Sequence, residues 1–118
     1  METAHPVAAW AAQQSRPGHR VLVVSDLADL RGPAEGVAEL PVRLFWSSPD
    51  RMFDLGKPFM VRAMYETVLG QARRPEDLTA HLNGALLISV WPELYLPKGI
   101  RAAWEERHPV LRTAAAAA

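Results

Sequence analysis

The sequence PFMVRAMYETVLGQA, residues 58–72, sets the helical character of the C-terminal half of this chain. Its apolar side chains recur at three- and four-residue spacing, which places them in one stripe along a helix. The stripe consists of Val61, Met64, Tyr65, Val68, Leu69 and Ala72. Proline suits the first position of a helix, so Pro58 marks the start. Arg73 and Arg74 suit the end, because positive charge is favourable at a helix C-terminus.

Further helical segments are expected after residue 72. Pro75-Glu76-Asp77 opens a short helix that runs to about Leu82 and ends at Asn83-Gly84. Residues 85–91, ALLISVW, are apolar nearly all round and form either a fully buried helix or a buried strand. We favour a helix, ended by Pro92.

The last predicted helix begins at Pro97 and ends at Pro109. It carries Ile100, Ala103 and Trp104 on one face. The alanine run 114–118 has no packing partner in the sequence pattern, so we expect it to be disordered.

The N-terminal part mixes helix and strand signals. The predicted elements are a short helix over Val7–Gln14, a buried strand over residues 20–24, a short helix over 26–30 with Ser25 as its N-cap, a loop over 33–39, a strand over 40–46 and a connection over 51–56. Pro41 places the start of the second strand at a sheet edge.

These patterns predict an α+β fold, with a predominantly helical C-terminal half and a short two-stranded β element in the N-terminal half. A chain of 118 residues has the length of one domain. We expect a single domain over residues 1–113, in which 1–56 form the mixed part and 57–113 the helical part, followed by the disordered tail.

Composition narrows the classes of function. Thirteen basic and thirteen acidic residues give a formal net charge of zero, whereas a dedicated nucleic-acid binder usually carries a basic excess. The absence of cysteine removes disulfides, thiolate nucleophiles and Cys-based zinc sites. No apolar run approaches the ~20 residues of a membrane span, and the N-terminus lacks the pattern of a signal peptide. We therefore expect a cytoplasmic protein.

The residues that could carry chemistry do not form a recognisable site. His5, His19, His81 and His108 lack the spacing of a zinc pair and are expected to be solvated surface imidazoles. Asp26, Asp29 and Asp54 could contribute to a metal-dependent nuclease site, but Asp26 and Asp29 are more simply explained as first-turn helix acids. No phosphate-binding glycine motif occurs. We expect no metal, no cofactor and no enzymatic activity.

The unusual feature is the aromatic and proline content of residues 91–104. Leu94, Tyr95 and Leu96 are consecutive, so they cannot all face one core. Trp91 and Trp104 either close the helical core or, like other Trp, Tyr and Arg residues at interfaces, anchor a partner. The residues predicted to bind a partner are Trp91, Leu94, Tyr95, Leu96, Arg101, Trp104, Met64 and Tyr65.

The C-terminal half also carries a resemblance, in the segments Met64–Leu69, Pro75–Leu78, Leu86–Pro97 and Arg101–Glu105. Together these segments resemble a group of small actinobacterial proteins encoded beside nucleotidyltransferase-like toxins of the AbiEii type. The resemblance covers roughly residues 35–110 and rests on a pattern of residues, not on a catalytic signature.

The resemblance implies an antitoxin that binds its cognate nucleotidyltransferase-like toxin directly and inhibits it sterically. The chain lacks the Gly-Ser and Asp-x-Asp pattern that such transferases use for metal and triphosphate, so it is not the toxin itself. The alternative is a small DNA-binding transcriptional regulator that uses Val7–Leu30 as a degenerate helix-turn-helix. Charge neutrality argues against nucleic acid as the partner. Self-association into a homo-oligomer is also compatible with the sequence, and a membrane partner is not expected.

Overall fold

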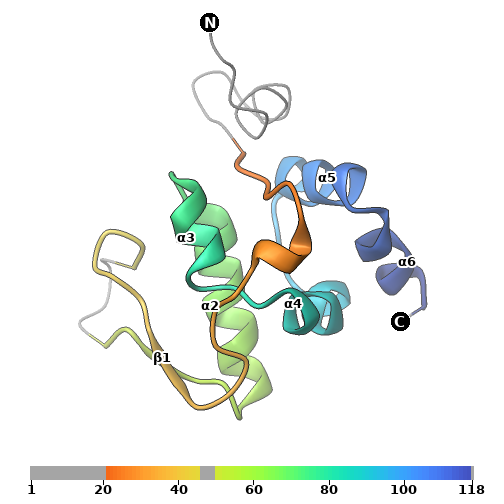
Figure 1. Cartoon of the computed structure of the whole chain (residues 1–118). Helices are drawn as coiled ribbons and strands as arrows, with labels where there is room; N and C mark the ends of the chain where they lie inside the picture. Colours follow the sequence, from red (N-terminus) through yellow and green to blue (C-terminus); the bar gives the residue numbers. More distant parts are fainter. Residues whose placement is uncertain (1–20, 46–49, 118) are drawn as a thin grey trace, which may run out of the picture.

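A computed structural model describes residues 21–45 and 50–117 of the chain (Figure 1). Its elements are the 3-10 helix η1 (Leu27–Asp29), strands β1 (Val37–Glu39) and β2 (Met52–Asp54), helices α2 (Pro58–Gln71), α3 (Pro75–Thr79) and α4 (Gly84–Val90), the 3-10 helix η2 (Trp91–Glu93), and helices α5 (Lys98–Arg107) and α6 (Pro109–Ala117). The two strands lie in the N-terminal half and the α-helices follow them. The predicted α+β class is therefore confirmed.

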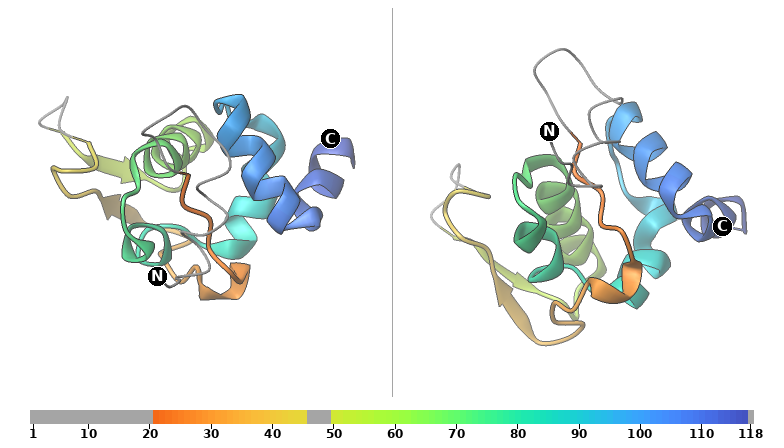
Figure 2. Two further views of the ribbon diagram at one scale, coloured as in Figure 1. Left: turned by 90° about the horizontal axis from the view of Figure 1, so that it is seen from above. Right: turned by 45° about the horizontal axis from the view of Figure 1, so that its top comes forward.

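Helix α2 lies between the strands and the C-terminal helices, as Figures 1 and 2 both show. Its buried face is the predicted apolar stripe, because the side chains of Val61, Met64, Tyr65, Val68 and Leu69 are all buried. Pro58 occupies the start of the helix, as predicted. One side of α2 contacts β2, and further contacts reach α3 and α4.

The helices after α2 follow the predictions with three differences. Residues 85–90 are helical, which confirms helix over strand, but Asn83 begins α4 instead of ending α3. The Asn83 side-chain oxygen accepts a hydrogen bond from the backbone N–H of Leu86 at 3.0 Å, which is the geometry of an N-cap. Helix α3 is correspondingly shorter than predicted and ends at Thr79.

The third difference concerns the C-terminus. Ile100, Ala103 and Trp104 are buried on one face of α5, as predicted. After His108 the chain begins a new helix at Pro109, and α6 includes Ala114–Ala117, where the sequence predicted a disordered tail. Leu111 is fully buried and Ala115 packs against the core. These tertiary contacts stabilise the alanine run as part of α6, and the sequence pattern did not predict them.

The predicted two-stranded element exists, but other segments form it. Strands β1 and β2 pair antiparallel with Ala38 opposite Phe53, and both of these side chains face the core. The ladder continues on either side, through Leu55 N to Gly36 O at 2.8 Å and Leu40 N to Arg51 O at 3.0 Å. Residues 37–39 had been predicted as loop and 52–54 as connection.

The two segments predicted as strands are wrong in their described parts. Val21, Val23 and Val24 are buried but belong to no strand, and residues 42–44 form a turn. In that turn the N–H groups of Leu44 and Phe45 both bond to Pro41 O. Apolar, β-branched sequence indicates burial here, whereas pairing depends on which backbone lies alongside. Arg20 and Trp46 lie outside the described residues, as does the helix predicted over 7–14.

The short helix after residue 24 is a single 3-10 turn, η1. Its N-cap is Asp26, whose side chain accepts the Ala28 N–H at 2.9 Å, and not Ser25 as predicted. Within residues 21–30, the described part of the predicted helix-turn-helix, η1 is therefore the only helical turn.

Asn83 joins three separate parts of the fold. Its backbone N–H donates to the Tyr65 hydroxyl of α2 at 2.9 Å. The backbone beside it bonds to the segment after η1, through Gly32 N to Leu82 O at 2.7 Å and Gly84 N to Leu30 O at 3.2 Å. This junction requires the two backbones to approach closely, and Gly32 permits it: a Cβ there would lie 2.5 Å from the carbonyl carbon of His81.

We expect Gly32→Ala to lower the free energy of unfolding by about 1–3 kcal/mol, because the added methyl group overlaps backbone that cannot move aside. The matched control is Gly70→Ala in α2, where a Cβ meets nothing within 4 Å. That variant should gain about 0.5–1 kcal/mol, since alanine is the better helix residue. Urea denaturation of both variants checks the pair, and equal stability of the two would contradict the role given to Gly32.

Candidate partner-binding surface

Most residues predicted to bind a partner lie in the core. Trp91, Trp104, Met64 and Tyr65 are fully buried, and Leu94 is 4% exposed. Side chains in these positions contact the rest of this chain and present no surface to another protein. Of the two interpretations left open for Trp91 and Trp104, the structure supports closure of the helical core.

The two tryptophans pack on each other and on Arg101. Their ring centroids are 6.4 Å apart at an interplanar angle of 41°, and the Arg101 guanidinium carbon lies 4.9 Å from the Trp91 ring centroid. The Trp91 indole N–H donates to Glu105 at 2.9 Å. Trp104 Nε1 is buried and has no hydrogen-bond partner within the described ranges. The cation–π contact adds an electrostatic attraction to the stabilisation that comes from burying these rings.

Arg101 fixes the segment between η2 and α5. Its Nη2 donates to the backbone carbonyl of Leu94 and lies 3.4 Å from that of Trp91, while Nη1 reaches Glu105 at 3.4 Å. The guanidinium is thus used to hold residues 91–94 against α5. Arg101 therefore supports this segment from within the chain, while about a quarter of its side chain stays exposed.

Tyr95 is the predicted residue that remains available, with 87% of its surface exposed. Its backbone N–H donates to Glu66 Oε2 of α2 at 2.8 Å. The backbone that carries the exposed ring is therefore held in place against α2. Leu96 is half-buried and packs against the core. The consecutive residues 94–96 therefore divide between core and surface, as their spacing predicted.

Tyr95 belongs to a larger exposed surface that includes one face of α2. Phe59, Arg62 and Glu66 are spaced three and four residues apart, so they line one side of that helix. Phe59 is 61% exposed, and Arg62 Nη1 pairs with Glu93 Oε1 at 3.2 Å beside the Tyr95 segment. We call these five residues the Tyr95 surface: Phe59, Arg62, Glu66, Glu93 and Tyr95. It combines two exposed aromatic side chains with two carboxylates and one guanidinium.

The sequence interpretation missed Phe59 and several other exposed apolar side chains. These are Val37, Val42, Met52 and Val110. For Phe59 a signal was present, because it lies off the apolar stripe of its helix. For Val37 and Met52 there was none, because exposure there follows from a strand pairing that the sequence did not predict.

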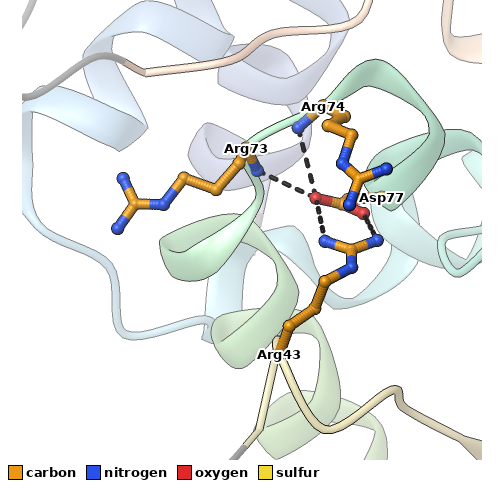
Figure 3. A network of polar contacts seen from close by, with 4 residues as sticks. All are labelled: Arg43, Arg73, Arg74 and Asp77. Carbon is orange, nitrogen blue, oxygen red and sulfur yellow. Dashed lines mark hydrogen bonds and ion pairs between the residues drawn. The ribbon is translucent and has the colours of Figure 1, made fainter.

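Among the described residues, the Asp77 carboxylate is the one that is fully buried (Figure 3). Both of its oxygens accept from the Arg43 guanidinium, and Oδ2 also accepts from the backbone N–H of Arg73 at 2.9 Å and of Arg74 at 3.2 Å. Although burial opposes ionisation, these donors outweigh it and lower the pKa of Asp77 to about 2. All its contacts are internal, so the carboxylate joins the turn after Pro41 to the α2–α3 junction.

His108 is buried, which corrects the prediction of a solvated imidazole. Its Nε2 lies 2.7 Å from the carbonyl oxygen of Val24, and its ring centroid lies 5.9 Å from that of Trp104. Burial lowers the pKa of His108, and burial likewise lowers that of the half-buried His81. His5 and His19 lie outside the described residues.

Two of the acids considered for metal binding, Asp26 and Asp54, accept hydrogen bonds from nearby backbone N–H groups. Asp26 caps η1, and the Asp54 side chain accepts the Gly56 N–H at 2.9 Å. In the part of the chain that the structure describes, no three His, Asp or Glu side chains gather as a metal ion would require. No helix in that part is long and apolar enough to cross a membrane.

Comparison of the chain with models of known protein families, with curated proteins and with solved structures found no match.

We expect Asp77→Asn to destabilise the protein by about 1–3 kcal/mol at pH 7. The substitution removes the negative charge that pairs with Arg43 and accepts hydrogen bonds from two backbone N–H groups. A carboxyl whose pKa falls from about 3.8 to about 2 on folding stabilises the fold above pH 4, and this contribution is lost as the pH falls toward 2. Urea denaturation at pH 7 and pH 2.5 should therefore show a smaller difference between variant and parent at the lower pH. A difference that does not change with pH would contradict the assignment.

We also expect stability to fall as the pH drops below about 6.5. The folded state holds His108 with a lowered pKa, so the unfolded chain binds a proton first and acid favours unfolding. The variant His108→Gln retains an N–H donor for Val24 O but does not titrate. Its unfolding free energy should decline less than that of the parent between pH 7 and pH 5, and an identical decline would assign the effect to other groups, such as His81.

Proposed function

We propose that this chain is an antitoxin of the cytoplasm that binds a nucleotidyltransferase-like toxin and excludes the toxin's substrate sterically. Two observations support the proposal. The C-terminal half resembles small proteins encoded beside such toxins, and the segment that carries the resemblance presents the nearly fully exposed ring of Tyr95. The second observation carries the argument, because it supplies a contact residue.

Tyr95 has the properties of an interface anchor. Tyrosine combines a large apolar ring with a hydroxyl, and tyrosines are enriched among the residues that contribute most to binding. The backbone bond to Glu66 and the Arg101 bond to Leu94 O hold the segment before binding. A residue that is already ordered loses less conformational entropy when a partner binds, which improves affinity.

The rest of the Tyr95 surface extends the contact. Phe59 offers a second ring on α2, and the Arg62–Glu93 pair lies between the two aromatic positions. A standard interface buries ~800 Å² on each partner, which a single side chain cannot supply. A rigid domain bound over the mouth of a transferase cleft would exclude nucleotide and acceptor by volume, without any reaction of its own.

The experiment is co-expression of this chain with the product of the neighbouring open reading frame, which the proposal requires to be transferase-like, with growth and complex formation as readouts. We expect rescue of growth by the parent chain. Tyr95→Ala should weaken the complex roughly tenfold or more, because it removes the anchor. The same change should alter stability by less than about 0.5 kcal/mol, because the ring has few internal contacts.

The matched control is Val110→Ala, which truncates an exposed apolar side chain on α6 that does not belong to the Tyr95 surface. It should leave binding and rescue unchanged. A toxin that stays active in the presence of excess parent chain would refute the proposed function. Full rescue by Tyr95→Ala would instead remove Tyr95 from the interface.

A further inference from the structure

Strand β1 has an open edge. In an antiparallel pair, successive residues point their N–H and C=O groups alternately toward and away from the neighbouring strand. The bonds at Gly36 O and Leu40 N show that even-numbered residues of β1 face β2. The backbone groups of Val37 and Glu39 therefore point outward, and no hydrogen bond within residues 21–45 and 50–117 reaches them on that side.

In the described part of the chain, β1 pairs with β2 alone, so its second edge is not paired with another strand. Figure 2 shows β2 between β1 and α2, with β1 at the periphery of the described part. The opposite edge differs, because the N–H of Met52 on β2 donates to Asp50 Oδ1 at 3.0 Å and Asp54 O accepts from Lys57 N at 3.0 Å. Of the two edges, that of β1 can accept a further strand.

The side chains of the hairpin indicate which strand would fit. Residues 35–40 and 50–55 carry four carboxylates, Glu35, Glu39, Asp50 and Asp54, and one guanidinium, Arg51. Arg51 Nη2 lies 3.7 Å from Glu39 Oε2, and its Nε donates to Leu40 O at 3.0 Å. The residues of the hairpin thus carry a negative excess, and the apolar side chains of Val37 and Met52 are exposed among them.

We propose that the open edge of β1 binds an extended, basic segment of a partner protein as a third, antiparallel or parallel strand. Main-chain bonds to Val37 and Glu39 would supply the pairing, and the negative excess selects positive side chains. A second copy of this chain is disfavoured as the occupant, because two copies paired on this edge would bring the carboxylates of both hairpins together. The inference deepens the proposed function by adding a contact surface remote in sequence from Tyr95.

The probe is a blocked six-residue peptide of alternating lysine and valine, titrated into the isolated full chain. In a strand at this edge, alternate side chains lie on opposite faces, so the lysines would lie beside Glu39 and the valines beside Ala38. We expect saturable changes in the amide NMR signals of Val37 and Glu39, and slower solvent exchange of these two amides. A matched peptide of alternating glutamate and valine should bind at least tenfold more weakly.

Two variants separate backbone pairing from charge. Glu39→Pro removes an outward N–H that the β1–β2 ladder does not use, so the fold should persist while binding falls at least tenfold. Glu39→Gln retains the N–H and should weaken binding only about threefold. If Glu39→Pro unfolds the protein, a lysine–valine peptide methylated on the amides that face β1 replaces it, and this peptide should not bind the parent chain.

The proposal is overturned if both peptides bind equally, if Glu39→Pro or amide methylation leaves affinity unchanged, or if the chain occupies the edge itself as a dimer in sedimentation analysis. The peptide titration requires no toxin. Edge binding can therefore fail while co-expression rescues growth, and rescue can fail while the peptide binds, so failures of the two proposals are distinguishable.

Discussion

The close backbone contact around Asn83 is the constraint on which the rest of the structure depends. Its N–H bonds to the Tyr65 hydroxyl of α2, its side chain caps α4, and the flanking residues bond to the backbone from Leu30 to Gly32. The segment after η1, the central helix and the C-terminal helices thus meet at one residue. Burial of these polar groups is favourable only because each has a partner, so the junction sets the arrangement of the three parts.

The same logic separates structural polar groups from those that could serve function. The Asp77 carboxylate, the Arg101 guanidinium and the His108 imidazole are all engaged within the chain, and each fixes a connection between elements. Two features at the surface of the described part are not engaged in this way. They are the exposed ring of Tyr95 and the outward backbone groups of β1. Both proposals derive from that distribution.

Part of the candidate site was predictable from sequence. The spacing of Leu94, Tyr95 and Leu96 required at least one of them to face outward, and Tyr95 does. Five of the other predicted contacts lie in the core: Met64, Tyr65, Trp91, Leu94 and Trp104. Large aromatic and aliphatic side chains are equally suited to a core and to an interface, so residue type did not distinguish the two. Trp91 and Trp104 became core residues because Trp104 of α5 packs against Trp91. The Trp91 indole N–H donates to Glu105, and the Arg101 guanidinium lies over the Trp91 ring.

The sequence by itself determined the presence of helices α2 to α5 and the class of the fold. Periodic apolar spacing over residues 58–72 and prolines at helix starts are local signals, and a helix makes its own hydrogen bonds. Only the tertiary structure decided which segments form strands, because a strand bonds to backbone remote in sequence. The pairing of residues 37–39 with 52–54, and the burial of His108 beneath Val24, depend on that approach, and no local pattern encodes it.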